Sequence, residues 1–153
     1  MLRVNRDSKN FIYQNRFTDY VVDGKVWDSL WHIPITYTSK VNSTEKNRPN
    51  FWLSQRTMEI TIDEVKPDSY FLVNTMQTGY YRVQYDEVNW MLIAGELSHG
   101  NFSKIHPNSR AMLIDDASVF FENKILKIRV LLELMKYLEH DVRRWQYEKR
   151  KLL

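Results

Sequence analysis

The spacing of apolar residues changes once along this chain, close to residue 85. Before that point apolar side chains recur at every second position, which is typical of strands with one buried face. After it they recur at every third or fourth position, which is typical of helices. The pattern predicts an α+β fold by segments: a small antiparallel β-sandwich over residues 1–85, then the first helices of an α-helical solenoid over residues 86–153.

The clearest strand pattern runs from Trp31 to Thr38. Its odd positions are large and apolar and its even positions are polar or proline, so one face is expected to be buried. Pro34 has no backbone N–H, which places the strand at a sheet edge or leaves that position unpaired. Further alternating sets are Phe11, Tyr13 and Phe17; Met58, Ile60 and Ile62; Phe71 and Val73; and Tyr81, Val83 and Tyr85. Turn-forming residues separate these sets, as expected for a small sandwich.

Three helices are predicted in the second half. Asp86 caps the first, whose apolar residues face several directions, so this helix is expected to be buried on more than one side. Gly95 weakens it, and residues 98–101 end it. Pro107 opens the second helix. The apolar positions of the second helix are Leu113, Ile114, Ala117, Phe120 and Phe121.

The third helix carries its apolar residues at Ile125, Ile128, Leu131, Leu132, Met135 and Leu138. Because only a short link joins it to the second helix, the pair is interpreted as an αα-hairpin of the kind that builds helical solenoids. Residues 141–153 are charged and poorly periodic. They are interpreted as a helix end or as a shortened next helix.

Composition limits the classes of function. The chain has 153 residues, enough for one ordinary domain or two small ones, and 43% hydrophobic with 27% charged residues is a globular composition. An aromatic content of 14% favours strands. The absence of cysteine excludes disulfides, thiolate zinc sites and a cysteine nucleophile.

The net charge of +3 is small, and much of the positive charge lies near the C-terminus. This cluster is either a patch for an acidic partner or a solvated, frayed helix end, and the second interpretation is preferred because no nucleic-acid motif accompanies it. The first residues lack the apolar core of a signal peptide, and no apolar run approaches the roughly 18 residues that span a bilayer. The chain by itself is expected to be soluble, or else it is a piece of a longer protein. These features do not identify the cellular compartment.

Several motifs occur in one order along the chain. They are Val4–Asp7, Gln14–Phe17, Trp31–Tyr37, Thr78–Asp86 with Asn89-Trp90, Arg110–Ala117 and Tyr137–Glu139. Together, over roughly residues 3–140, they resemble the aminopeptidase N-like zinc metallo-aminopeptidases, also called gluzincin aminopeptidases. The resemblance implies the third, β-sandwich domain of that family and the start of its C-terminal helical domain. Its signature residues here are Gly79, Tyr80, Tyr81, Arg82, Tyr85, Asp86, Trp90, Arg110, Asp115 and Asp116.

The chain departs from the family pattern at a few places. Gln84 stands where the family usually has Asn, and Met112 where it usually has Gln. The segment Asp141–Trp145 is shorter than its family counterpart and lacks a proline, which leaves the boundary of the last helix open.

Activity in the family requires a His-Glu-x-x-His helix with a distant Glu for zinc, and a Gly-x-Met-Glu-Asn loop for the substrate's amino terminus. Neither motif occurs here, and no two of the histidines, His32, His99, His106 and His140, stand four residues apart. The chain is therefore predicted to contain no catalytic, cofactor-binding or metal-binding residue. Zinc would belong to the catalytic domain of a longer parent.

Other polar residues favour structural roles. Asp115 and Asp116 with Arg110 suggest acid–base chemistry, but adjacent helix positions point about 100° apart, so at least one carboxylate is expected to anchor a neighbouring element instead. Arg82 either contacts an aromatic ring through its cation or faces solvent. Asn42 and Asn101 begin N-glycosylation sequons in predicted loops, which matter only if the parent is secreted.

The sequence thus predicts a non-catalytic fragment of an aminopeptidase N-like protein, whose parent would remove N-terminal residues from peptides. This part would serve as a spacer between domains and as the start of the cap over the substrate chamber. The alternative is a free-standing protein-interaction module that has lost catalysis. The expected partner is the rest of the parent or another protein, bound through exposed helix faces. Whether the chain is a cut piece, a truncated gene or a natural short protein stays open.

Overall fold

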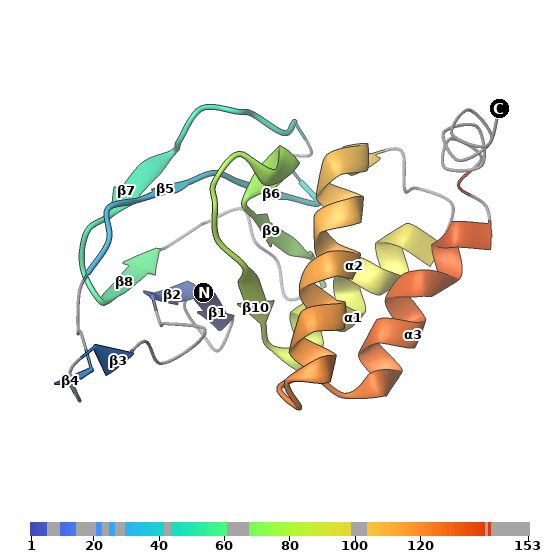
Figure 1. Ribbon diagram of the computed structural model, residues 1–153. Helices are drawn as coiled ribbons and strands as arrows, with labels where there is room; N and C mark the ends of the chain where they lie inside the picture. Colours follow the sequence, from blue (N-terminus) through green and yellow to red (C-terminus); the bar gives the residue numbers. More distant parts are fainter. Residues whose placement is uncertain are drawn as a thin grey trace, which may run out of the picture.

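The computed structural model describes residues 1–5, 10–14, 21–22, 25–26, 30–41, 44–60, 68–98, 104–139 and 141. Within these residues the strands come first and the helices follow, with the strands lying to one side of the helices (Figure 1). This order confirms the α+β class predicted from the change in apolar spacing. The α-helical solenoid and the division into two domains at residue 85 stay predictions.

The largest sheet has four strands in the order β10-β1-β2-β8. These strands are β1 (Leu2–Asn5), β2 (Asn10–Gln14), β8 (Thr57–Ile60) and β10 (Val83–Tyr85). The β1–β2 and β2–β8 pairs are antiparallel as predicted, whereas β10 runs parallel to β1. Because β10 immediately precedes the first helix, this parallel pair fixes the N-terminal strand beside the strand–helix boundary.

Three antiparallel pairs complete the described strands. They are β3 (Val21–Val22) with β4 (Lys25–Val26), β5 (Ile33–Ile35) with β7 (Phe51–Leu53), and β6 (Tyr37–Ser39) with β9 (Phe71–Val73). Within the described part of the chain β5 has only β7 as a neighbour, which confirms the expected edge position of Pro34.

The strand predicted over residues 31–38 is divided in the structure. Thr36 separates β5 from β6, and the two halves pair with different strands. The predicted faces are wrong at both ends of this strand, because Trp31 is 46% exposed whereas Thr36 and Thr38 are both buried. The alternation of residue types could not show that the chain passes from one sheet to another and is then covered on both sides.

The helices are α1 (Glu87–Glu96), α2 (Pro107–Glu122) and α3 (Ile128–Met135), with short 3₁₀ turns at η1 (Thr75–Gln77) and η4 (Lys136–Glu139). The predicted cap is confirmed, since the Asp86 side chain accepts a hydrogen bond from the Asn89 N–H at 2.8 Å. Pro107 stands in the first turn of α2, where a missing N–H is tolerated. Helix α3 packs against both α1 and α2.

The apolar faces predicted for two helices are partly wrong. Phe121 is 38% exposed at the end of α2. Helix α3 buries Val130, Leu131 and Leu134. Its exposed apolar side chains are Ile128, Leu132 and Met135. Because α3 has apolar residues around most of its circumference, the period alone could not decide which side would face α1 and α2.

One hydrophobic cluster spans the strand–helix boundary. Buried side chains from the strands and from all three helices belong to it. Its largest fully buried members include Tyr70, Phe71, Tyr85, Trp90 and Phe120. The secondary structure changes at residue 86, but the core is continuous across that residue.

Candidate functional site at the strand–helix joint

Residues 78–90, here called the joint, begin at a turn closed by Asn74. This side chain is fully buried, and its backbone is left-handed with φ 61°, which Asn tolerates better than most residues. Its Oδ1 accepts from the Gly79 N–H at 2.8 Å. Its Nδ2 donates to the carbonyls of Gly79 at 3.0 Å and of Tyr81 at 2.9 Å. One amide thus fixes the whole turn that leads into β10.

Two tyrosine hydroxyls anchor the joint to other strands. The Tyr81 hydroxyl donates to the Pro34 carbonyl at 2.8 Å. The Tyr85 hydroxyl accepts from the Val73 N–H at 2.9 Å and donates to the Val73 carbonyl at 3.2 Å. Burial raises the pKa of both phenols, for Tyr85 well above its ordinary value. Both therefore stay neutral at physiological pH and serve as hydrogen-bonding anchors.

Gly79→Ala is expected to lower the free energy of unfolding by about 1–3 kcal/mol, as overpacking does. A Cβ at this position would overlap the ring of Tyr81, and that ring cannot easily move because its hydroxyl is bonded to Pro34. Urea unfolding followed by circular dichroism measures the loss. The matched control is Gly95→Ala, where nothing lies within 4 Å of the added methyl, so a gain of up to about 1 kcal/mol is expected. Equal effects at both glycines would contradict the tight contact.

An ion-pair cluster connects the joint to α2. The Arg82 Nη1 lies 2.6 Å from the Asp115 Oδ2 and 2.8 Å from the Asp116 Oδ1. The second oxygen of Asp116 accepts from the Val83 N–H at 2.8 Å. The Asp116 side chain is only 4% exposed, whereas that of Asp115 is 59% exposed. Asp116 therefore ties the first residue of β10 to the middle of α2.

This cluster corrects part of the sequence interpretation. Arg82 was expected over an aromatic ring or in solvent, but its strongest described contacts are with the two carboxylates. The two carboxylates were expected to point apart, yet both reach one guanidinium nitrogen because the long arginine side chain lies between them. The prediction that at least one of them anchors a neighbouring element is confirmed by Asp116.

Burial controls the electrostatics of the cluster. It raises the pKa of Asp116 to about 6, although the Val83 N–H and Arg82 both act in the opposite direction. For Arg82, burial opposes the charge, but hydrogen bonds to the two carboxylates outweigh it and raise the pKa. A cavity of about 550 Å³ lies beside the cluster, lined in part by Tyr80 and Arg82. The cluster orients β10 on α2 and lines this cavity with one guanidinium and two carboxylates.

The first turn of α1 is bound to β9 by a second buried amide. The Asn89 Oδ1 accepts from the Phe71 N–H at 2.9 Å, and its Nδ2 donates to the Phe71 carbonyl at 2.7 Å. Next to it, the fully buried Trp90 ring meets the Tyr85 ring edge-on, with centroids 4.9 Å apart. Sequence reasoning missed these roles of Asn74 and Asn89, because a buried asparagine has the same local signature as one in a turn.

Arg110, in the first turn of α2, is held by residues that lie before and after this helix in the sequence. Its Nη2 lies 2.7 Å from the Asp141 Oδ2, and its Nη1 donates to the Ile105 carbonyl at 2.7 Å. Its guanidinium carbon also lies 5.8 Å from the centre of the Tyr137 ring. Arg110 therefore anchors the N-terminal end of α2 to Ile105 and Asp141.

The described residues do not fit a zinc site of the two-histidine, one-glutamate kind. His106 caps α2, its Nδ1 accepting from the Asn108 N–H at 3.2 Å, and His32 is exposed on the strand side. In the described part of the chain, no three His, Cys, Asp or Glu side chains lie close enough to hold a metal ion. His99, His140 and the sequon residues Asn42 and Asn101 lie outside the described residues. The helices that the structure describes are all too short or too polar to cross a membrane.

Comparisons with known proteins show the family to which this chain is similar. The family model described as "ERAP1-like C-terminal domain" matches residues 70–147, which begin just before the joint. The human thyrotropin-releasing hormone-degrading ectoenzyme is 34% identical over 125 residues, 80% of this chain. The aminopeptidase N of Plutella xylostella is 34% identical over 143 residues, 88% of this chain. The membrane alanyl aminopeptidase of Heliothis virescens is 26% identical over 140 residues, 92% of this chain.

The relatives are much longer than this chain. The matched segment covers 12% of the human ectoenzyme and 14% of each of the two insect enzymes. The names of all three describe enzymes, and two of these names refer to a membrane or to an ectoenzyme.

Proposed function

Because this chain belongs to the aminopeptidase N-like family, we propose that it forms the non-catalytic joint between the strand and helical parts of a longer zinc aminopeptidase. The parent would remove N-terminal residues from peptides, and the helices here would begin the cap over its substrate chamber. The observation that carries the proposal is the attachment of β10 to α2 through Asp116, which binds both Arg82 and the Val83 N–H.

A joint of this kind must hold two parts of a protein in one orientation. Three independent contacts do so here: Asp116 between α2 and β10, Asn89 between α1 and β9, and the buried cluster that includes Tyr85 and Trp90. All three are buried, so they are not loosened by competition with water. A fixed orientation would place the cap over the chamber, where a small shift of the helices changes how a substrate is held.

The isolated chain is expected to release no product from N-terminal aminoacyl anilides, with or without added zinc, because the described residues lack the ligand set. A suitable control is a chimera in which this chain replaces the matched segment of the Plutella xylostella aminopeptidase N. The chimera should turn over the same substrates, since the catalytic part is then present. Zinc-dependent turnover by the isolated chain would refute the non-catalytic role, and an inactive but zinc-loaded, folded chimera would refute the joint role.

One observation favours a second candidate, a free-standing protein-interaction module. Ile128, Leu132 and Met135 form an exposed apolar row along α3, at positions that share one helix face. In the first proposal this row contacts further parts of the parent. In the second it binds a separate protein, so the purified chain should capture one specific partner without the catalytic part being present.

The names of the relatives support a parent at the cell surface or outside the cell. In that compartment the sequons at Asn42 and Asn101 could carry glycans. A shift in mass after treatment of the secreted parent with a glycosidase would detect them.

A further inference from the structure

The cavity of about 550 Å³ beside the Arg82 cluster presents polar groups that the described part of the chain does not use. The Arg82 Nη1 is bonded to both aspartates, whereas its Nε and Nη2 have no partner among the described residues. Asp115 likewise bonds to Arg82 through Oδ2, which leaves its Oδ1 free. The two side chains are 33% and 59% exposed, so a ligand can reach them.

A fully exposed aromatic ring, that of Tyr80, lines the same cavity. The backbone that carries this ring is fixed, because the Asn74 side chain bonds to Gly79 and Tyr81, the residues on either side of it. Tyrosine rings in folded proteins are usually at least partly buried. A ring that is fixed in place and fully exposed, beside unused hydrogen-bonding groups, points to a surface for a ligand.

The accessible charges of this cavity cancel each other. Arg82 and Asp115 contribute one positive and one negative charge, with their nearest atoms 2.6 Å apart. Asp116 is only 4% exposed, and both of its oxygens are already bonded within the protein. Met1 also lines the cavity, and burial lowers the pKa of its amine, which favours the neutral form. A neutral ligand that both donates and accepts hydrogen bonds therefore fits this lining better than a cation or an anion does.

We propose that this cavity binds a neutral sugar ring. Each hydroxyl group of a sugar can donate and accept, so one hydroxyl would accept from the free edge of the Arg82 guanidinium while its neighbour donates to the Asp115 Oδ1. The C–H groups on one side of the sugar would lie against the face of the Tyr80 ring, which is the negative part of its quadrupole. A cavity of this volume has room for about one or two sugar rings. The sugar could be free or part of a glycan, and the same chemistry recognises both.

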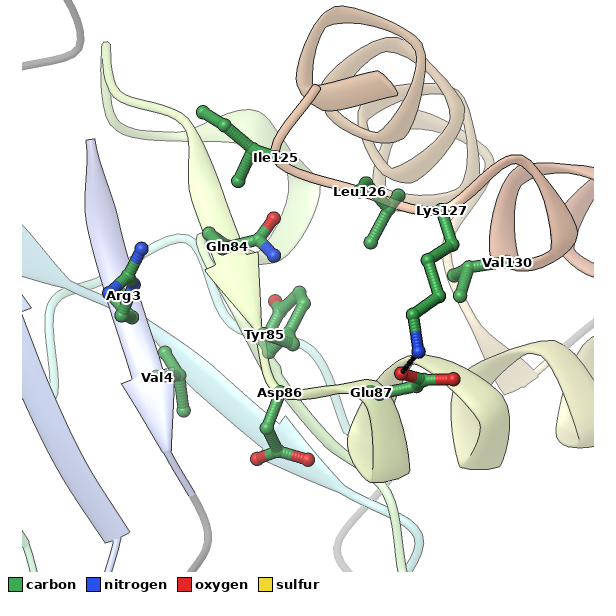
Figure 2. Close-up of a pocket in the computed structure, with 10 residues that line it drawn as sticks. All are labelled: Arg3, Val4, Gln84, Tyr85, Asp86, Glu87, Ile125, Leu126, Lys127 and Val130. Atoms are coloured by element: carbon green, nitrogen blue, oxygen red, sulfur yellow. Dashed lines mark hydrogen bonds and ion pairs between the residues drawn. The ribbon is translucent and has the colours of Figure 1, made fainter. Parts of the chain in front are cut away.

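A smaller cavity, of about 270 Å³, serves as an internal control (Figure 2). In Figure 2 the Lys127 side chain reaches Glu87, and the Nζ and Oε2 atoms lie 2.7 Å apart, so these two charges are already paired. The one aromatic residue of its lining, Tyr85, is buried. This cavity offers no exposed ring on which a sugar could stack, so we expect no sugar to bind there.

The test is a titration of the ¹⁵N-labelled full chain, followed by NMR, with the methyl pyranosides of glucose, galactose and mannose. At least one of them should cause a saturable shift of the backbone amides of Tyr80, Arg82 and Asp115, while those of Leu126 and Val130 in the smaller cavity stay unchanged. Tetrahydropyran-2-methanol has the ring but lacks neighbouring hydroxyl groups, so it should cause no saturable shift. Chitobiose, the disaccharide at the base of N-linked glycans, distinguishes the sources: tighter binding than that of every monosaccharide identifies a glycan, and weaker binding identifies a free sugar.

The decisive variant is Tyr80→Ala, which should weaken sugar binding by about tenfold and leave Tm unchanged, because the exposed ring packs against nothing in the fold. Tyr80→Phe keeps the ring and should bind nearly as well as the original chain. Asp115→Ala removes the free acceptor and should also weaken binding by about tenfold. Trp52→Ala removes an exposed ring on β7 and should leave binding unchanged. The proposal is overturned by no saturable shift with any of the three pyranosides, by equal binding of tetrahydropyran-2-methanol, or by unchanged binding in Tyr80→Ala.

Discussion

Trp90→Ala is expected to lower the free energy of unfolding by about 3–5 kcal/mol, the usual cost of emptying a buried tryptophan site. Trp90 is fully buried, and its ring meets the Tyr85 ring at an interplanar angle of 89°. Since Tyr85 ends β10 and Trp90 lies in the first turns of α1, this pair packs the last strand against the first helix. The cavity left by alanine would lie inside the cluster shared by strands and helices.

Urea unfolding measured by far-ultraviolet circular dichroism gives the loss, and two further variants sharpen its meaning. Val88 lies on the same helix but is 64% exposed, so Val88→Ala should change the free energy of unfolding by no more than about 0.5 kcal/mol. Trp90→Phe keeps a ring against Tyr85 and removes the Trp90 Nε1, which is buried without a hydrogen-bond partner in the described structure. It should therefore cost much less than alanine. A loss below about 1 kcal/mol for Trp90→Ala would contradict a core shared across the boundary.

The features that the sequence predicted correctly depend on neighbouring residues. The order of strands and helices follows from the spacing of apolar side chains, which each segment carries within itself. The cap at Asp86 and the helix start at Pro107 depend on backbone groups three or fewer residues away. Such features can be predicted from a short stretch of sequence, because no distant residue is needed to form them.

The features that the sequence missed depend on distant partners. The parallel pairing of β10 with β1 joins residues about 80 positions apart, and nothing within either strand specifies it. The division of the strand at Thr36 arises because its two halves meet β7 and β9. The buried face of α3 depends in the same way on where α1 and α2 lie.

For the candidate site, the sequence located the joint but not its contacts. The motif around Arg82 marked the position, whereas the partners of Arg82 lie 33 and 34 residues away on α2. Asn89 likewise reaches a strand residue 18 positions earlier. The full exposure of the Tyr80 ring could not be found from sequence at all, because a tyrosine beside a strand is more often partly buried.

Asp116→Asn is expected to become more stable relative to the original chain as pH rises from about 4 to 6. Burial raises the pKa of Asp116 from 3.8 to about 6, so between these values the folded chain binds a proton that the unfolded chain has released. The free energy of unfolding of the original chain therefore falls as pH rises through this range. At about 1.4 kcal/mol for each pKa unit, the difference between the two proteins should shift by about 3 kcal/mol in favour of Asn.

Two further variants separate the charge of Asp116 from its hydrogen bond. Asp116→Ala leaves the Val83 N–H without its acceptor, so it should be about 1–3 kcal/mol less stable than Asp116→Asn at every pH. Asp115→Asn changes a carboxylate on the same guanidinium, but one that is 59% exposed, so its effect should stay below about 1 kcal/mol. Urea unfolding at a series of pH values measures all of these differences.

A parallel pH dependence in the original chain and in Asp116→Asn would show that this carboxylate is not the source of the effect. The expected divergence has a consequence for the joint. If the charged form of Asp116 destabilises the fold near neutral pH, stability does not account for an aspartate at this position. A role in orientation does, because its charge holds Arg82 and β10 in one orientation on α2. The Asn variant would then be the more stable protein with the less strictly oriented joint. In the chimera with the Plutella xylostella enzyme, it should lower turnover even though it raises stability.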